Sequence, residues 1–202
     1  MVVEGNTQFG TVRSSSLDTK LESLLLQKKS AILEKWLDLI LEVYPSETQR
    51  FLKKQKDRFA NPVGYTILQG MEALYHALIH GIDYDKVSPF LDRIVRIRAV
   101  QDFSPSQAIA FIFILKKVIR EELGTEIREN QLFDELLILE TQIDKLALLS
   151  FEIYMKCREK IYEIRVNEVK NSVYMLLKRA NLICEIPEQE PDVKDHNIHS
   201  LT

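Results

Sequence analysis

Residues 104–123 read SPSQAIAFIFILKKVIREEL, and this stretch decides the fold. Ser104 and Pro105 are typical of a helix start, because serine caps the free N-terminus and proline is accepted in the first turn. From Ala108 to Ile119, apolar residues lie on nearly every side of the helix. A helix of this kind belongs inside a protein core. The stretch therefore predicts a central helix that other helices cover.

Upstream of the central helix, the pattern predicts four more helices. Apolar residues recur at three- and four-residue steps from Leu17 to Tyr44, which indicates one amphipathic helix. Ser46 is expected to cap a short helix whose apolar side carries Phe51, Leu52 and Phe59.

Asn61 can cap the next predicted helix, which begins with Pro62 and ends at His80 before Gly81. A further helix is expected from about Asp85 to Val100.

Downstream, the central helix is expected to end at Gly124, and a long periodic stretch covers Ile127 to Leu182. A heptad-like seam is reset near Ile161, so either the helix breaks there or its buried face rotates. The second seam consists of Val166, Val169, Val173 and Leu176. The first seam has more apolar length than one small core absorbs. We therefore expect this seam and the central helix together to form the interface of a homodimer. Its interface candidates are Leu132, Leu136, Leu139, Ile143, Leu146 and Ile153.

Composition supports a helical class. Only six Gly and six Pro occur in 202 residues, which disfavours turn-rich β-sandwiches and barrels. The expected fold is all-α, with about six helices and a long C-terminal one. We expect a mobile tail over residues 1–15, one domain over 16–184 and a disordered polar tail over 185–202.

Charge and cysteine usage point to the cytoplasm. The net charge of -3 disfavours a general nucleic-acid binder, and no apolar run approaches the roughly 20 residues that span a bilayer. The N-terminus has no secretory signal pattern. Two distant cysteines, Cys157 and Cys184, fit a reducing compartment. We expect a soluble protein without nucleic-acid binding or membrane insertion.

The sharpest candidate for chemistry is a histidine stripe. Glu72, His76 and His80 follow one another at four-residue steps and share one helical face, where they could hold a transition metal. Either histidine could also serve as an axial haem ligand. Histidines in such a pattern more often have a structural role. We therefore expect that the protein binds neither a metal nor a cofactor.

Catalytic motifs are missing from the sequence: it has no GxSxG elbow, no phosphate loop and no HExxH. We therefore expect a protein that is not an enzyme. Two basic clusters remain, residues 53–58 and residues 93–98. Arg96 is the more notable position, because apolar neighbours would draw it inward and a buried arginine needs a carboxylate or ligand partner.

Three stretches together resemble the N-terminal domain of RsbRD-type RsbT co-antagonist proteins. They are residues 36–45, residues 51–64 with the block FANPVG, and residues 97–116 with the block PSQA. The resemblance covers about Leu24 to Ile153.

The resemblance implies a globin-like, haem-free sensory domain that usually pairs as a dimer in front of an output module, such as a STAS domain or a kinase, in bacterial stress signalling. After the long last helix only about 20 polar residues follow, so no STAS domain is carried over. That departure puts stressosome membership in doubt, and it leaves a stand-alone domain whose output passes through another signalling or output protein.

Three functions stay open. The first is a non-catalytic signalling domain that binds a protein partner and, as an option, a small ligand. The second is an accessory or docking subunit for an enzyme or membrane complex, and the third is a histidine-ligated metal or haem protein. For a ligand pocket, the sequence predicts a site formed by Asn61, Tyr65, Tyr75, His76 and Arg96.

Overall fold

The computed structural model describes residues 19–54 and 57–182. These residues form seven α-helices and no strand, so the predicted all-α fold with a long C-terminal helix is confirmed. The predictions for both tails and for Cys184 lie outside the described residues. The helices are α1 (Thr19–Gln27), α2 (Lys29–Leu41), α3 (Ser46–Lys54), α4 (Pro62–His80), α5 (Tyr84–Val100), α6 (Pro105–Glu129) and α7 (Phe133–Arg179).

The chain divides into two compact units, Met1–Ile161 and Tyr162–Thr202. Helices α1 to α6 and the part of α7 up to Ile161 belong to the first unit. The described part of the second unit is the remainder of α7 and the residues up to Leu182, all of them exposed.

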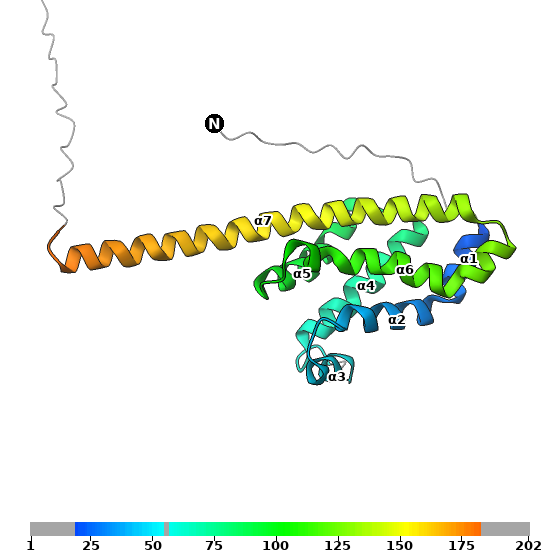
Figure 1. The fold of residues 1–202 in the computed structure, drawn as a ribbon, viewed down its shortest axis with the longest axis horizontal. Helices are drawn as coiled ribbons and strands as arrows, with labels where there is room; N and C mark the ends of the chain where they lie inside the picture. The colour runs from blue at the N-terminus through cyan, green and yellow to red at the C-terminus, as the bar shows by residue number, and fades with distance from the viewer. Residues whose placement is uncertain (1–18, 55–56, 183–202) are drawn as a thin grey trace, which may run out of the picture. The chain divides into compact units, whose positions relative to one another are not determined.

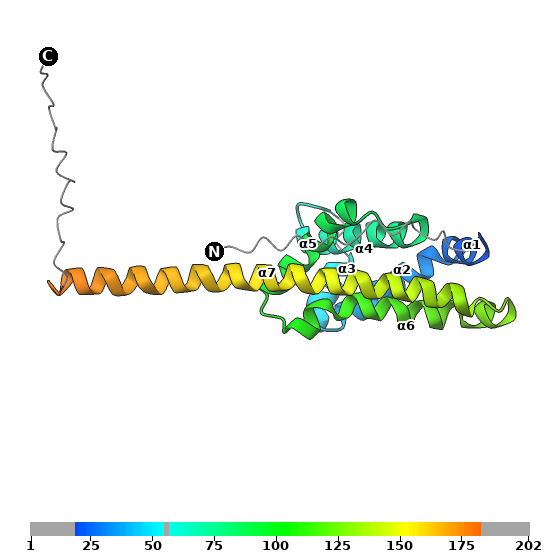
Figure 2. The same cartoon turned by 90° about the horizontal axis from the view of Figure 1, so that it is seen from above.

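Helix α6 packs one face into the core of the first unit, but other helices do not cover it on every side as the sequence predicts, because Phe113 and Lys117 are exposed. In the view of Figure 1 it is drawn between the first part of α7 and α2, and Figure 2 shows it along one side of the unit, with α4 and α5 on the opposite side. Eight side chains of α6 are buried, among them Phe111, Leu115 and Ile119. Two hydrogen bonds tie α6 to α2: the Trp36 Nε1–H donates to the backbone oxygen of Phe111 at 2.7 Å, and the Lys35 ammonium donates to the Glu122 carboxylate at 2.8 Å.

Two helix starts form as the sequence predicts. The Asn61 side-chain oxygen accepts the Gly64 N–H at 2.9 Å, and Pro62 follows in the first turn of α4. At α6, Ser104 and Gln107 cap each other's backbone N–H groups in a capping box. These local devices need no tertiary contact, which is why the sequence alone locates them.

Several helix boundaries differ from the prediction. The helix expected from Leu17 to Tyr44 is divided at Lys28 into α1 and α2, and Leu25 and Ile32 on either side are both buried. Helix α6 does not stop at Gly124 but continues to Glu129, because Ile127 beyond the glycine is buried in the core. Packing there outweighs the cost of about 1 kcal/mol for glycine inside a helix.

The turn between α6 and α7 lies at residues 130–132, where Gln131 adopts a left-handed backbone conformation with φ 58°. Helix α7 then continues past Ile161 without a break. On α3, Leu52 is buried but Phe51 is exposed. Phe59 is exposed too and lies beyond the end of α3 at Lys54, so the predicted apolar side of that helix is wrong for two of its three residues.

Across the described ranges, the length and apolar character that a helix needs to cross a bilayer do not occur together.

Candidate functional site

Two of the five predicted pocket residues are structural. Asn61 is buried as the cap of α4, and its side-chain amide also donates to the Leu52 backbone oxygen at 3.0 Å. Tyr75 is buried in the core, where its hydroxyl donates to the Leu25 backbone oxygen at 2.8 Å. Burial raises the pKa of the Tyr75 phenol. The predicted pocket therefore does not assemble around all five residues.

Tyr65 and Arg96 lie on a surface formed by α4 and α5, where they line two adjoining grooves. The first groove measures about 540 Å³ and is lined by Arg58, Phe59, Pro62, Tyr65, Thr66, Gln69, Phe90 and Arg93. The second measures about 510 Å³ and is lined by Val63, Thr66, Arg93, Arg96, Ile97, Val100 and Gln101. The two share Thr66 and Arg93. We refer to both together as the α4–α5 groove.

Of the residues that line the α4–α5 groove, the pocket prediction named only Tyr65 and Arg96, and it missed the basic and aromatic side chains of Arg58, Phe59 and Arg93. Both basic clusters were visible in the sequence, but they are some 35 positions apart. Only the packing of α5 against α4 shows that they face one groove. The distance between the two clusters along the sequence does not indicate that they lie close together in space.

The histidine stripe does not form a ligand set. The His76 and His80 rings lie 4.3 Å apart, and the His80 Nδ1 lies 3.5 Å from the Glu22 carboxylate rather than near Glu72. In the described ranges, no three His, Cys, Asp or Glu side chains come close enough to hold a metal ion. Neither histidine lines the α4–α5 groove.

The arginine drawn into the interior is Arg98, not Arg96. Arg96 is exposed and forms a bidentate contact with Asp92 at 3.0 to 3.2 Å. Arg98 is only 2% exposed, and its guanidinium lies over the rings of Phe103 and Phe111 at 5.3 and 5.0 Å. The prediction was wrong by two positions because Ile97 is only half-buried, while Arg98 lies on the inward face of α5.

No carboxylate of the described residues pairs with Arg98. One guanidinium nitrogen donates to the Gln107 backbone oxygen at 3.0 Å, and the other two have no hydrogen-bond partner. Burial lowers the pKa of Arg98, and the nearby Tyr44 opposes that shift only in part. A desolvated cation in this position costs stability.

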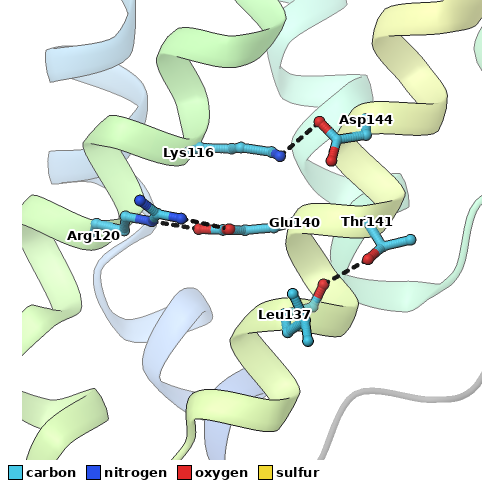
Figure 3. A network of polar contacts seen from close by, with 6 residues as sticks. All are labelled: Lys116, Arg120, Leu137, Glu140, Thr141 and Asp144. Atoms are coloured by element: carbon cyan, nitrogen blue, oxygen red, sulfur yellow. Dashed lines mark hydrogen bonds and ion pairs between the residues drawn. The ribbon is translucent and has the colours of Figure 1, made fainter.

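Polar contacts connect α6 to the first part of α7 (Figure 3). Arg120 forms a bidentate pair with Glu140 at 2.5 and 2.6 Å, and Lys116 reaches Asp144 at 2.6 Å. Hydrogen bonding to Glu140 raises the pKa of Arg120. Glu140 is buried, and the Arg120 guanidinium balances its charge through two parallel hydrogen bonds. The contacts fix the register between the two helices.

The predicted dimer residues face inward. Leu132, Leu139, Ile143, Leu146 and Ile153 are buried in the core of the first unit, and Leu136 is half-buried. A dimer contact through them would require the core to open, so that contact stays a prediction. The large apolar residues that α7 exposes in this unit are Phe133, Leu137, Ile138, Leu148, Phe151 and Met155.

In the second unit, by contrast, the predicted seam is on the surface. Val166, Val169, Val173 and Leu176 are all exposed. They follow one another at alternating three- and four-residue steps on a continuous helix.

Cys157 is expected to react slowly with alkylating reagents. Burial raises the pKa of its thiol, since the lowering effect of Arg96 is the smaller contribution, and the thiolate is the reacting species. In a Cys184→Ser background, iodoacetamide should modify native Cys157 more slowly than a free cysteine at the same mildly alkaline pH. Peptide mass spectrometry measures the rate, with urea-unfolded protein as the fast control. Equal rates in folded and unfolded protein would contradict the shift.

Comparison with known proteins identifies a family. A family model described as the RsbT co-antagonist protein rsbRD N-terminal domain matches residues 30–169. An uncharacterized protein of Archaeoglobus fulgidus is 25% identical over an alignment of 155 residues, and the match covers 74% of this chain and 90% of that protein. No solved structure matches the chain at a significant level. The globin-like arrangement implied by the resemblance therefore stays a prediction.

Proposed function

The chain belongs to the RsbT co-antagonist protein rsbRD N-terminal domain family, and on that basis we propose that it is a non-catalytic sensory domain that signals in the cytoplasm as a homodimer. The family implies a stressosome-type signalling context. In this proposal the output passes to another signalling protein through contact between protein surfaces.

One observation carries the proposal: the exposed seam of the second unit. With Val166 and Val173 at a positions and Val169 and Leu176 at d positions, the seam follows the heptad pattern of a coiled coil. A helix without tertiary packing is marginal in water, so this segment needs a partner helix to be stable. An identical seam on a second copy is self-complementary, and β-branched residues at a positions favour two strands.

In the proposed dimer, helix α7 can transmit a structural change from the first unit to the paired seams. Helix α7 begins inside the packed first unit and continues into the seam without a break. A change in the first unit that rotates or shifts α7 would change the register of the paired seams, and an output protein would recognise that change. The polar contacts of Arg120 and Glu140 hold α7 to α6 at the sensory end.

We expect the wild-type chain to be a dimer and the variant Val169→Glu/Val173→Glu to be a monomer at tens of micromolar. The variant places two carboxylates of each chain in the seam, where they would be buried opposite those of the other chain. They also replace the apolar contacts of the two valines. Native mass spectrometry and light scattering measure the state. The control Asn167→Glu/Asn171→Glu adds the same charge off the seam and should stay dimeric. A wild-type monomer, or a seam variant that still pairs, would contradict the proposal.

A docking subunit that senses nothing is the second candidate. It is favoured by the α4–α5 groove, which is a surface feature and suits a protein partner. Native mass spectrometry of protein from its own host distinguishes the two, because a discrete small adduct on the dimer supports sensing. A metal or haem centre has the least support, since Glu72, His76 and His80 do not come together around one point.

A further inference from the structure

We propose that the α4–α5 groove binds an acidic, amphipathic segment of a partner protein. This inference rests on the proposed function, in which output passes through a protein contact, and it names the surface and the chemistry of that contact.

The charge of the groove carries the argument. Three arginines line it, Arg58, Arg93 and Arg96, and no carboxylate does. Among the described residues, Arg58 and Arg93 take part in no ion pair, whereas Arg96 is held by Asp92. The first groove thus presents two cations whose charge no carboxylate of residues 19–54 and 57–182 balances in an ion pair. An anionic group that enters it forms charge-assisted hydrogen bonds with guanidinium groups, the donors best suited to carboxylates.

The apolar part of the groove indicates what accompanies the negative charge. Phe59 is 91% exposed in the first groove, and Val100 is 67% exposed in the second. The Arg93 guanidinium already lies over the Phe90 ring at 5.5 Å, so cation and aromatic surface are presented together. Aromatic residues and arginine are the types that dominate binding energy at protein interfaces. An occupant with apolar and acidic side chains in alternation matches both features.

Hydrogen-bond donors point to the same partner. The Tyr65 hydroxyl accepts a hydrogen bond from Gln69 at 2.7 Å, which leaves its own proton to donate. Pro62 and Val63, one in each groove, belong to the first turn of α4, the positive end of its dipole. Donors and positive charge therefore surround the groove.

The length of the surface favours a protein segment over a small molecule. The two grooves adjoin through Thr66 and Arg93, so an extended occupant can lie along both of them. A small carboxylate would neutralise the arginines of one groove and leave either Phe59 or Val100 uncovered.

The test uses a fluorescein-labelled synthetic peptide of about four helical turns, with Leu and Phe at helical spacing and Glu elsewhere. Fluorescence anisotropy with the full-length chain should show micromolar binding that weakens as salt is added. Matched peptides with Gln or Lys in place of Glu should bind at least about tenfold more weakly.

Variants locate the site. Arg58→Glu/Arg93→Glu should weaken binding of the Glu peptide at least about tenfold, and Phe59→Ala should weaken it without changing the salt dependence. The control Lys29→Glu/Lys117→Glu makes the same change in net charge on exposed positions of α2 and α6 and should bind within about twofold of wild type.

Three results would overturn the inference: equal binding of the Glu and Gln peptides, undiminished binding by the double arginine variant, or complete displacement of the peptide by excess benzoate, which would indicate a site for small carboxylates. Light scattering on the same samples keeps the two proposals apart. Loss of peptide binding in an intact dimer refutes only the groove, while a monomer that still binds the peptide refutes only the dimer.

Discussion

Replacing Trp36 with alanine is expected to lower the free energy of unfolding by about 3 to 5 kcal/mol. The Trp36 side chain is completely buried, and it fills the space between α2 and the central helix α6. The substitution removes this contact and leaves a cavity that a close-packed interior closes only in part. It also removes the hydrogen bond from the indole to the Phe111 backbone oxygen.

Thermal unfolding followed by circular dichroism measures this effect, because Trp36 is the only tryptophan and cannot serve as the probe in its own absence. The midpoint should fall by roughly 6 to 20 °C. Protein concentration is held constant, since association contributes to apparent stability. The control Trp36→Phe keeps an aromatic ring and should lose less than half as much. A shift below about 2 °C for alanine would show that α2 does not pack on α6 as described.

Replacing Arg98 with methionine is expected to raise the free energy of unfolding by about 1 to 3 kcal/mol. The guanidinium is desolvated. In the part of the chain that the structure describes, two of its three nitrogens lack hydrogen-bond partners and no carboxylate compensates its charge. Methionine has a similar unbranched shape and keeps the contacts with Phe103 and Phe111 without the cost of a buried charge. Lost attraction between the cation and the two rings offsets only part of the gain.

Urea unfolding of Arg98→Met and of the control Arg98→Lys tests the sign. Lysine keeps the buried charge but loses the planar stacking and the fork of donors, so Arg98→Lys should be less stable than wild type. A methionine variant less stable than wild type would contradict the prediction and would mean that the guanidinium has a partner in solution that balances its charge.

The helix ends show how far local sequence reaches. The caps at Asn61 and Ser104 were located correctly, because each depends on residues within one turn. Gly124 was taken for a helix end and is not one. A glycine lowers helix propensity, but burial of Leu123 and Ile127 on either side decides the outcome, and burial is a property of the whole fold.

The candidate site was predicted less well for the same reason. Helical periodicity identifies an apolar face, yet it does not say whether that face meets the chain's own core or a second chain. Leu139 and Ile143 meet the core, whereas Val169 and Val173, with the same spacing, lie exposed. Periodicity is equally silent on the exact rotation of a helix, which is why Arg98 rather than Arg96 faces inward.

The sequence by itself determined the all-α class, a helix over residues 108–119, the capped starts of two helices and the family, since each rests on composition, on spacing within one helix or on contiguous motifs. Only the tertiary structure decided which apolar faces are buried, that Arg98 is an unpaired interior cation, and that Arg58 and Arg93 line one groove. The physical reason is that burial and charge pairing depend on how helices distant in sequence pack together. The sequence of one helix does not specify which helices pack against it.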